Sequence, residues 1–503
     1  MRTSFLAALV VAAALPLPVA AAGSDDNSLT VAFAREMDTL NPYLNTTREG
    51  VILSRHVWDG LVHRDQETGD YVGNLATGWS WVDDTTLEFT LREGVTFHNG
   101  EPFNADDVVY TMNFVADPAN GVNPQRNVSW IREAVKIDDN TVRIITDGPF
   151  PAALEFLSGP VVILPDTYFA EVGPEGMATA PIGTGPYKLT ENVPGESLTL
   201  ERFADYHANG PKGTASIDKI SWRTIPDANT QMAEMLSGGM DWIWQVPSDQ
   251  AERLASTGRY TVANESTMRI GYIFFDAGDR YGDTPFDDVR VRHAVSHAIN
   301  RQAIVDNLLK GGSQVVHSAC FPSQFGCDTD VTRYEYDPEK AMALLAEAGY
   351  PNGFEIPFVA YRNRDYAEAM MSDLAAVGIT PKLDYKKYAA TRDQIQAGEV
   401  PLAFMTWGSY SINDISAITS VFFKGGKDDY ARDPEVIAAL DEGDTVTDPE
   451  VRKAAYSRAL NKIADESYWL PLFSYNTNYV HDTNLNFTPT PDEIPTFYGA
   501  SWK

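Results

Sequence analysis

Residues 75–112 constrain the fold more than any other stretch of the sequence. Apolar and polar residues alternate across residues 87–91, which is the pattern of a strand that buries one face. Residues 83–86 have the composition of a turn, and two tryptophans stand two positions apart just before them, at 79–81. The spacing therefore predicts a β-hairpin with one buried face.

The second part of this segment predicts a short strand followed by a helix. The strand is expected at residues 95–97, and Asn104 is one of the residue types that cap a helix N-terminus. Asp106 and Asp107 would then lie in the first helical turn, where negative charge is favourable. The whole segment is expected to run strand, strand, strand, helix, as one wall of an α/β domain.

The same segment resembles the signature region of the family 5 extracellular solute-binding proteins, which are the peptide, dipeptide and nickel receptors of ATP-binding cassette (ABC) importers. This resemblance is carried by Ala76, Trp79, Asp83, Thr86, Leu87, Phe89, Leu91, Arg92, Gly94, Val95, Phe97, Gly100, Phe103, Ala105, Asp107 and Val108. It implies an α/β fold like that of the type II periplasmic binding proteins, with two lobes joined by a hinge and an extra small domain.

Residues 181–189 resemble a second family landmark, where the chain leaves the small domain. Gly183 and Gly185 are expected there in a strained crossover with positive φ, which glycine adopts at little cost. A phosphate-binding loop is rejected because no Lys-Ser or Lys-Thr pair follows.

The domain boundaries follow from the resemblance, because no linker or low-complexity tract interrupts the chain. The sequence is expected to divide into a signal peptide (1–22), a discontinuous domain I (23–66, 182–267 and 475–503), domain II (67–181) and domain III (268–474). Strand and helix patterns alternate in domain III, so its sheet should be largely parallel.

The first 22 residues have the features of a secretory signal. Arg2 supplies the positive end, an apolar run follows, and the alanines at 20–22 form a small-residue cleavage site. No cysteine follows that site to carry a lipid, so we expect a soluble periplasmic protein that is not a lipoprotein. An uncleaved N-terminal anchor is the alternative.

The net charge of the chain limits the classes of partner that it can bind. Lysine and arginine number 39 against 70 aspartates and glutamates, a formal net charge of −31. Such a surface repels phosphate backbones and anionic lipids, so binding to nucleic acid or to a membrane surface is not expected.

The chain has two cysteines, Cys320 and Cys327. Export would place them in an oxidising compartment, so a disulfide between them is expected, with two free thiols as the alternative.

The sequence carries no motif of an enzyme. It lacks a G-x-S-x-G elbow, an H-E-x-x-H pair, a P-loop and an EF-hand loop. His293 and His297 stand four apart on a predicted helix, but Arg290 and Arg292 lie among them, a poor setting for a cation. We therefore expect no catalytic residues, no metal site and no cofactor.

Three ligand-binding residues are implied by the resemblance. Thr46 occupies the place where family members contribute a hydroxyl after the first strand. Arg362, with Arg364 as the alternative, is similar to the arginine that binds the peptide carboxylate in dipeptide receptors, and a planar guanidinium suits that role. Trp407 lines the cleft in the family, although it could equally be a buried strand anchor.

One departure from the family pattern concerns the peptide amine. Peptide receptors carry an aspartate three residues after the tryptophan, whereas this chain has Tyr410 there. A phenol cannot neutralise a buried ammonium. Asp414 is either a substitute after a loop shift or a second family aspartate that shapes the loop.

These patterns predict a monomeric periplasmic receptor that closes two lobes on an oligopeptide or dipeptide and delivers it to an inner-membrane ABC permease. Within the same transporter class, Tyr410 favours an alternative ligand such as an opine, an oligosaccharide or a metal chelate. A secreted hydrolase is the alternative from another class, and a folding helper or adhesin is a third.

Overall fold

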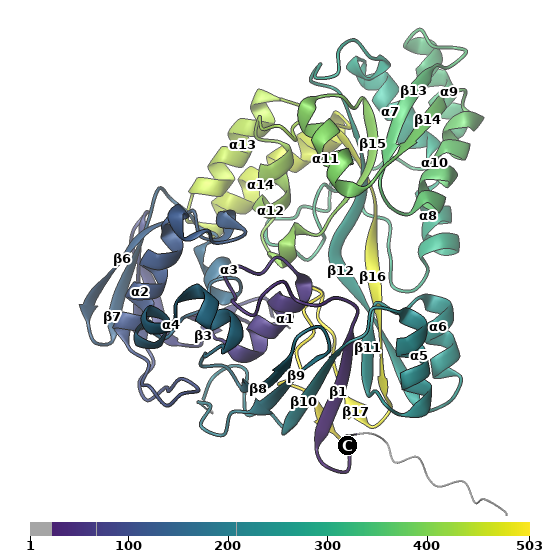
Figure 1. Ribbon diagram of the computed structural model, residues 1–503. Helices are drawn as coiled ribbons and strands as arrows, with labels where there is room; N and C mark the ends of the chain where they lie inside the picture. Colours follow the sequence, from purple (N-terminus) through teal and green to yellow (C-terminus); the bar gives the residue numbers. More distant parts are fainter. Residues whose placement is uncertain (1–22, 67, 208) are drawn as a thin grey trace, which may run out of the picture.

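The computed structural model describes residues 23–503 except 67 and 208. Two long strands run side by side through its main body. Strand β12 (Tyr260–Phe275) pairs antiparallel with β16 (Trp469–Asp482) from Tyr260 opposite Asp482 to Phe274 opposite Trp469. Figure 1 shows the pair rising from the lower part of the molecule into the upper part. Together they lie in the middle of a ten-stranded sheet of order β14-β13-β15-β12-β16-β11-β1-β10-β9-β8.

The sheet has two halves on either side of this pair. The upper half-sheet consists of β13 (Glu355–Ala360), β14 (Thr380–Tyr385) and β15 (Leu402–Trp407). The lower half-sheet consists of β1 (Ser28–Phe33), β8 (Tyr187–Val193), β9 (Ser197–Arg202), β10 (Lys219–Thr224) and β11 (Trp242–Trp244). Strand β13 pairs parallel with both β14 and β15, but β12 pairs antiparallel with β15 and with β16. The sheet predicted to be largely parallel is therefore parallel only across β13, β14 and β15.

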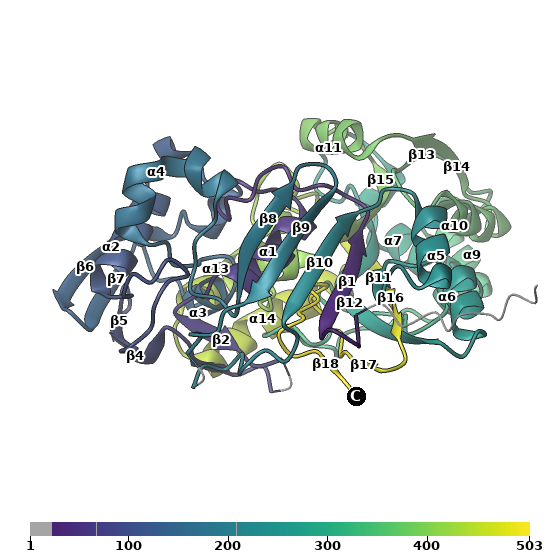
Figure 2. The ribbon, with the colours of Figure 1, turned by 60° about the horizontal axis from the view of Figure 1, so that its bottom comes forward.

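Helices cover both halves of the sheet (Figures 1 and 2). Those around the lower half-sheet are α1 (Arg48–Val57), α5 (Ala228–Ser237) and α6 (Ser248–Ala255). Those around the upper half-sheet are η3 (Pro285–Asp287), α7 (Val289–Ala298), α8 (Arg301–Ile304), η4 (Val305–Leu309), α9 (Pro338–Glu347), α10 (Arg364–Ala376), α11 (Tyr388–Ala397), η5 (Ser409–Ser411), α12 (Ser416–Phe422), α13 (Pro434–Thr445) and α14 (Pro449–Asp465). Among the described residues, no helix has both the length and the apolarity needed to cross a membrane.

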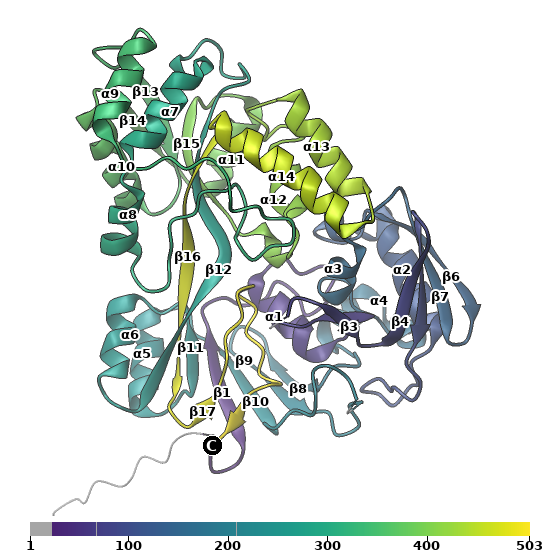
Figure 3. The same cartoon turned by 180° about the vertical axis from the view of Figure 1, so that it is seen from behind.

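A second sheet forms a separate small unit at the side of the molecule. Its order is β4 (Ala76–Asp83), β5 (Thr86–Leu91), β7 (Thr141–Thr146) and β6 (Ile131–Asp138). With α2 (Ala105–Ala116), α3 (Ala153–Ser158), α4 (Asp166–Thr179) and the turns η1 (Pro118–Asn120) and η2 (Gln125–Asn127), we call this the small unit. Figures 1 and 3 show α13 and α14 on the side of the upper half that faces it. Two strand pairs complete the chain, β2 (Val62–Arg64) with β3 (Tyr71–Gly73) and β17 (Leu485–Asn486) with β18 (Ser501–Trp502).

Alternation along β12 explains how one strand serves two cores. Ile270, Tyr272 and Phe274 pack into one buried cluster, whereas Ile273 and Phe275 pack into another on the opposite face of the sheet. Successive side chains of a strand point to opposite faces, so this run of apolar residues is the signature of a strand covered on both sides.

The predicted hairpin of the small unit is confirmed, and the strand predicted after it is wrong. Strands β4 and β5 pair antiparallel, and the inward residues of β5 are buried. Asn104 caps α2 by accepting from the Asp106 N–H, while the Asp107 carboxylate accepts from the Asn104 N–H. Between them, Thr96 makes only an isolated bridge to Pro102, because the chain doubles back within six residues and has no strand to pair with.

The two glycines of residues 181–189 have a reason other than the one expected. Neither Gly183 nor Gly185 has a positive φ. A Cβ atom on Gly183 would lie 2.1 Å from the Val57 carbonyl oxygen, and one on Gly185 would lie 2.4 Å from that of His56. Glycine is required here because the crossover runs against the end of α1.

The predicted signal peptide, residues 1–22, lies outside the described residues.

A buried ion pair joins the segments around this crossover. Lys212 Nζ lies 2.7 Å from Asp59 Oδ1, and both side chains are almost fully buried. Thr184 donates to the same carboxylate at 3.1 Å and Asn74 at 3.0 Å. Burial alone would raise the pKa of Asp59, but the adjacent Lys212 ammonium holds it well below its usual range.

We predict that Asp59→Asn destabilises the protein by roughly 3–5 kcal/mol, because it leaves Lys212 charged and buried without a counter-ion. Urea unfolding followed by circular dichroism measures the change. Asp218→Asn is the matched control: its ion pair with Arg202, at 2.6 Å, is exposed, so removing it should cost less than about 1 kcal/mol. Equal losses for the two variants would contradict the role given to the buried pair.

Candidate ligand-binding site

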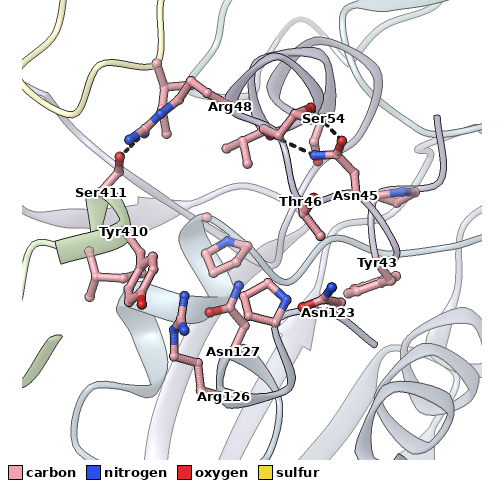
Figure 4. Close-up of a pocket in the computed structure, with 18 of the residues that line it drawn as sticks. Tyr43, Asn45, Thr46, Arg48, Ser54, Asn123, Arg126, Asn127, Tyr410 and Ser411 are labelled. Carbon is pink, nitrogen blue, oxygen red and sulfur yellow. Dashed lines mark hydrogen bonds between the residues drawn. The ribbon is translucent and has the colours of Figure 1, made fainter. Parts of the chain in front are cut away.

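A group of polar side chains converges where the lower half, the upper half and the small unit meet. A pocket of about 370 Å³ opens there, which we call the main pocket (Figure 4). The lower half supplies the loop before α1, with Tyr43, Asn45 and Thr46, and the start of α1 itself, with Arg48. The remaining walls are the small unit around Arg126 and Asn127 and the upper half around Tyr410 and Ser411.

The loop that carries Tyr410 has an unusual backbone. Ser409, Tyr410 and Ser411 all have positive φ, at 48°, 52° and 64°. Each such non-glycine residue costs on the order of 1 kcal/mol, so the surrounding contacts must hold the loop in place. Arg48 does so from the lower half by donating to Ser411 Oγ and to the Asp492 carbonyl. Backbone strain held this way is typical of ligand clamps.

The disulfide expected between Cys320 and Cys327 is present, and it closes a turn that supports the same loop. Within this turn, Gln324 donates to the Ile412 carbonyl at 2.8 Å and the Phe325 N–H donates to the Asn413 carbonyl at 3.1 Å. The Ile415 N–H donates back to the Phe325 carbonyl at 3.2 Å. The disulfide-closed turn therefore fixes the backbone that follows Tyr410.

A smaller pocket of about 270 Å³ lies at the carboxyl ends of β13 and β15, and we call it the arginine pocket. Thr406, near the end of β15, receives two guanidinium donors: Arg269 at 3.3 Å and Arg362 at 3.5 Å. The Tyr361 hydroxyl lies 2.6 Å from the same Thr406 oxygen. Arg269 reaches this point because its neighbour Ile270 pairs with Trp407. Ligands of α/β sheets commonly bind beyond the carboxyl ends of the strands.

The two guanidinium groups lack an anionic partner. No Asp or Glu oxygen among the described residues lies within 4 Å of a side-chain nitrogen of Arg269 or Arg362. Arg362 instead lies over the Tyr475 ring, at 5.2 Å, and hydrogen-bonds to Asn363. Two like charges directed at one neutral hydroxyl form a site that an anion would complete.

Tyr410 separates the pockets of the cleft. Its side chain is 44% exposed and lines the main pocket, the arginine pocket and a third pocket of about 370 Å³ between the small unit and the upper half. The Trp407 ring meets it edge-on at 4.7 Å, and the Arg126 guanidinium lies 3.1 Å from its centroid on the side of the small unit. Burial is the main cause that raises the pKa of Tyr410, so it stays a neutral phenol.

Two carboxylates near the cleft are already engaged. Glu155, which lines the main pocket, lies 3.1 Å from Arg64 and accepts from the Asn413 N–H at 2.7 Å. Asp414 is 3% exposed and pairs with Arg452 at 2.8 Å. Neither has the exposed, unpaired oxygen that a ligand ammonium would require.

Comparisons with known proteins agree on one family. Residues 70–429 match the family model described as bacterial extracellular solute-binding proteins, family 5 Middle. The chain belongs to this family. Its relatives include heme-binding protein A of Haemophilus influenzae, 27% identical over 89% of this chain and 87% of that protein. The glutathione-binding protein GsiB of Escherichia coli is 28% identical over 98% and 97%.

A solved structure of the family confirms the fold. HbpA2 from Haemophilus parasuis superimposes with a TM-score of 0.83 at 26% identity, covering 95% of this chain and all of that one. The family 5 proteins are the substrate-binding components of ABC importers and not enzymes, so the hydrolase alternative is not supported. The type II periplasmic-binding-protein fold is thereby established for this family 5 chain.

The positions implied by the family resemblance divide into two groups. Thr46 lines the main pocket, with its hydroxyl donating to Asp38. Tyr410 and Trp407 line the arginine pocket, and Arg362 is adjacent through Thr406. Trp407 is nearly buried and donates to the Ala417 carbonyl, so it also anchors its strand.

The other group consists of residues that the structure keeps away from the cleft. Asp414 pairs with Arg452 and accepts from the Ser416 hydroxyl. Arg364 points to Glu368, at 2.7 Å, and is mostly exposed. His293 and His297 each face a different backbone carbonyl, at 2.8 Å and 2.7 Å. Within the described part of the chain, no three metal-ligating side chains cluster.

Four residues that line these pockets were not among those expected from the sequence: Arg48, Arg126, Asn127 and Arg269. Arg269 had a usable signal, because it is the single charge in the otherwise apolar and small run 268–275. A charge there has to lie at the end of the buried part of the strand. Arg126 had no such signal, since an arginine in a polar turn is usually a surface residue.

We predict that reducing the disulfide loosens residues 409–415. The turn closed by Cys320 and Cys327 should lose roughly 2–3 kcal/mol of stability by the loop-entropy relation, so the amides it supports open more often. Hydrogen exchange measured by mass spectrometry, with and without reductant, should show faster exchange in 409–415 than before. Strand β13 (Glu355–Ala360) serves as the internal control, and an unchanged rate in 409–415 would refute the support role.

Proposed function

We propose that this family 5 protein is a periplasmic importer receptor whose ligand is a peptide-like solute with at least one carboxylate, bound between Arg269 and Arg362. The observation that carries this proposal is the pair of guanidinium groups on the single Thr406 hydroxyl, with no carboxylate oxygen of the described residues within 4 Å of either group. A carboxylate has two oxygens and accepts parallel hydrogen bonds from guanidinium groups, whereas a neutral hydroxyl leaves their charges uncompensated.

The named ligands of the relatives are compatible with this chemistry. One relative is named for glutathione and another for heme, and both of these molecules carry carboxylates. The two molecules share little else, so a common requirement for a carboxylate would explain how one scaffold serves both. Oligopeptides and dipeptides satisfy it through their C-terminus.

A non-peptide carboxylate, such as an opine or a metal chelate, is the second candidate. Tyr410 stands where peptide receptors of the family have an aspartate, and two carboxylates near the cleft, Glu155 and Asp414, are paired with arginines. A ligand without an ammonium group would fit that arrangement without a lost interaction. A neutral oligosaccharide would leave the arginines unpaired and is less favoured.

The transport cycle would follow from closure of the two lobes. Domain boundaries at 267/268 and 474/475 would allow them to rotate about β12 and β16, and the ligand would stabilise the closed form by contacts that exist only there. As a monomer released from its signal peptide (residues 1–22), the receptor would then present the solute to the inner-membrane permease.

We predict that protein purified from its native host and then denatured releases small molecules that carry carboxylates. Mass spectrometry before and after methyl esterification counts the carboxyl groups of each released molecule. A ladder of short peptides would support the first candidate, and one non-peptide acid would support the second. Release of only neutral sugars would overturn the proposal.

We also predict that Arg269→Gln and Arg362→Gln each weaken ligand binding roughly 10- to 100-fold. The reason is that each removes one charge-assisted hydrogen bond, typically about 1.5–3 kcal/mol. Isothermal titration with the released ligand measures the change. Arg364→Gln is the control, because that arginine is exposed and paired with Glu368, and its affinity should be unchanged. Losses of equal size in all three variants would argue against a specific anion site.

A further inference from the structure

Arg126 is a second cationic group in the cleft, at a distance from the arginine pocket and on a different part of the fold. It lies in η2 of the small unit and lines both the main pocket and the third pocket. No Asp or Glu oxygen among the described residues lies within 4 Å of its guanidinium nitrogens. Its contact is the neutral ring of Tyr410, at 3.1 Å from the centroid.

The ring is a weaker partner for Arg126 than an anion would be. A cation over an aromatic face gains less than a guanidinium that donates two parallel hydrogen bonds to a carboxylate. Burial is the main cause that lowers the pKa of Arg126, and no carboxylate of the described residues offsets this shift. The groups that oppose this shift are the Tyr410 and Tyr388 phenols, which are weaker partners for a guanidinium than a carboxylate is.

The neighbouring Asn127 supplies an independent indication of a polar ligand group. Its side-chain oxygen is buried and has no hydrogen-bond partner among the described residues. Asn127 lines the same two pockets as Arg126. Because buried polar atoms are almost always hydrogen-bonded and an amide oxygen accepts, this atom is expected to gain a donor, such as a ligand N–H group, beside the group that Arg126 binds.

Tyr410 connects this position to the arginine pocket. It lines that pocket on one side and contacts Arg126 on the other. Glu155, the one carboxylate that lines the main pocket, is engaged by Arg64 and by the Asn413 N–H. A ligand that extends from the arginine pocket past the phenol of Tyr410 therefore meets a second cation without an ion-pair partner among the described residues. The carboxylates that line the main and third pockets, Glu155 and Asp444, are paired with Arg64 and Lys424.

We infer that Arg126 binds a second anionic group of the ligand, so that the protein selects peptide-like dicarboxylates over monocarboxylates. One carboxylate would lie between Arg269 and Arg362, and the other would lie against Arg126 and displace the edge of Tyr410. This inference rests on the proposed function and specifies its substrate class. Arg126 acts as a specificity residue that contacts the ligand directly.

The test uses peptides that differ by one charge. Glu-containing and Gln-containing versions of the same di- and tripeptides, Ala-Glu against Ala-Gln and Gly-Glu-Ala against Gly-Gln-Ala, are titrated calorimetrically into the full-length mature protein. We expect at least one Glu peptide to bind roughly 10- to 100-fold more tightly than its Gln partner. Arg126→Gln should abolish that difference by weakening the Glu peptide alone, and Arg126→Lys, which keeps the charge, should retain most of it.

The control variant is Arg132→Gln, an exposed arginine of the same small unit, which should leave both affinities unchanged. Equal binding of Glu and Gln peptides by the unmodified protein would overturn the inference and leave the proposed function intact. If Arg132→Gln also lost the preference for Glu peptides, the inference would be overturned, because the preference would then depend on the overall charge of the small unit and not on Arg126. If none of the peptides binds, the peptide-like class is wrong and the inference falls with it.

Discussion

The antiparallel pairing of β12 with β16 is the constraint on which the rest of the structure depends. Each strand belongs to both halves of the ten-stranded sheet, so neither half is complete without them. The register of the pair shifts between Ser266 and Ile270, which interrupts the ladder between the two halves. The predicted boundaries at 267/268 and 474/475 lie at or beside this interval, and they stay a prediction. Arg269 lies inside it, so any change of angle between the halves would move an arginine of the cleft.

The ligand site depends in turn on one loop, residues 409–415, that three sets of contacts hold in place. The backbone of residues 409–411 is unfavourable for non-glycine residues, and it persists because Arg48 holds it from the lower half and the disulfide-closed turn holds the residues that follow. Asp414 belongs to this support, since its pair with Arg452 lies behind the loop. A carboxylate used to fix the loop cannot also neutralise a ligand ammonium, so the absence of an aspartate at position 410 is not compensated locally.

The sequence was informative at several positions where the signal was local, although the local pattern at residues 95–97 predicted a strand that is not there. The cap at Asn104, the hairpin around residues 83–86 and the disulfide between Cys320 and Cys327 each follow from chemistry within a few residues, and each is present. The glycines at 183 and 185 were assigned to the wrong cause, because the closeness of α1 is a tertiary contact that no local pattern encodes. The site residues were missed for the same reason. Arg126 and Arg269 are 143 positions apart in the sequence, and only the fold brings both to Tyr410.

The placement of the arginines on opposite walls of the cleft links binding to closure. Arg126 belongs to the small unit, whereas Arg269 and Arg362 line the upper half; Arg48 of the lower half is already paired with Glu493, at 3.6 Å. Two unit charges roughly 10 Å apart near a protein surface repel by about 1.7 kcal/mol, so without an anion these walls resist approach. An anion between the walls attracts the arginines of both, so the electrostatic interaction across the cleft changes from repulsive to attractive. Because this attraction exists only when the walls are close, the anion binds the closed form more tightly and shifts the hinge equilibrium towards it. The net charge of −31 opposes this at long range, but salt screens it beyond about 8–10 Å. Selection of an anionic solute therefore rests on the few arginines within that distance and not on the charge of the whole protein.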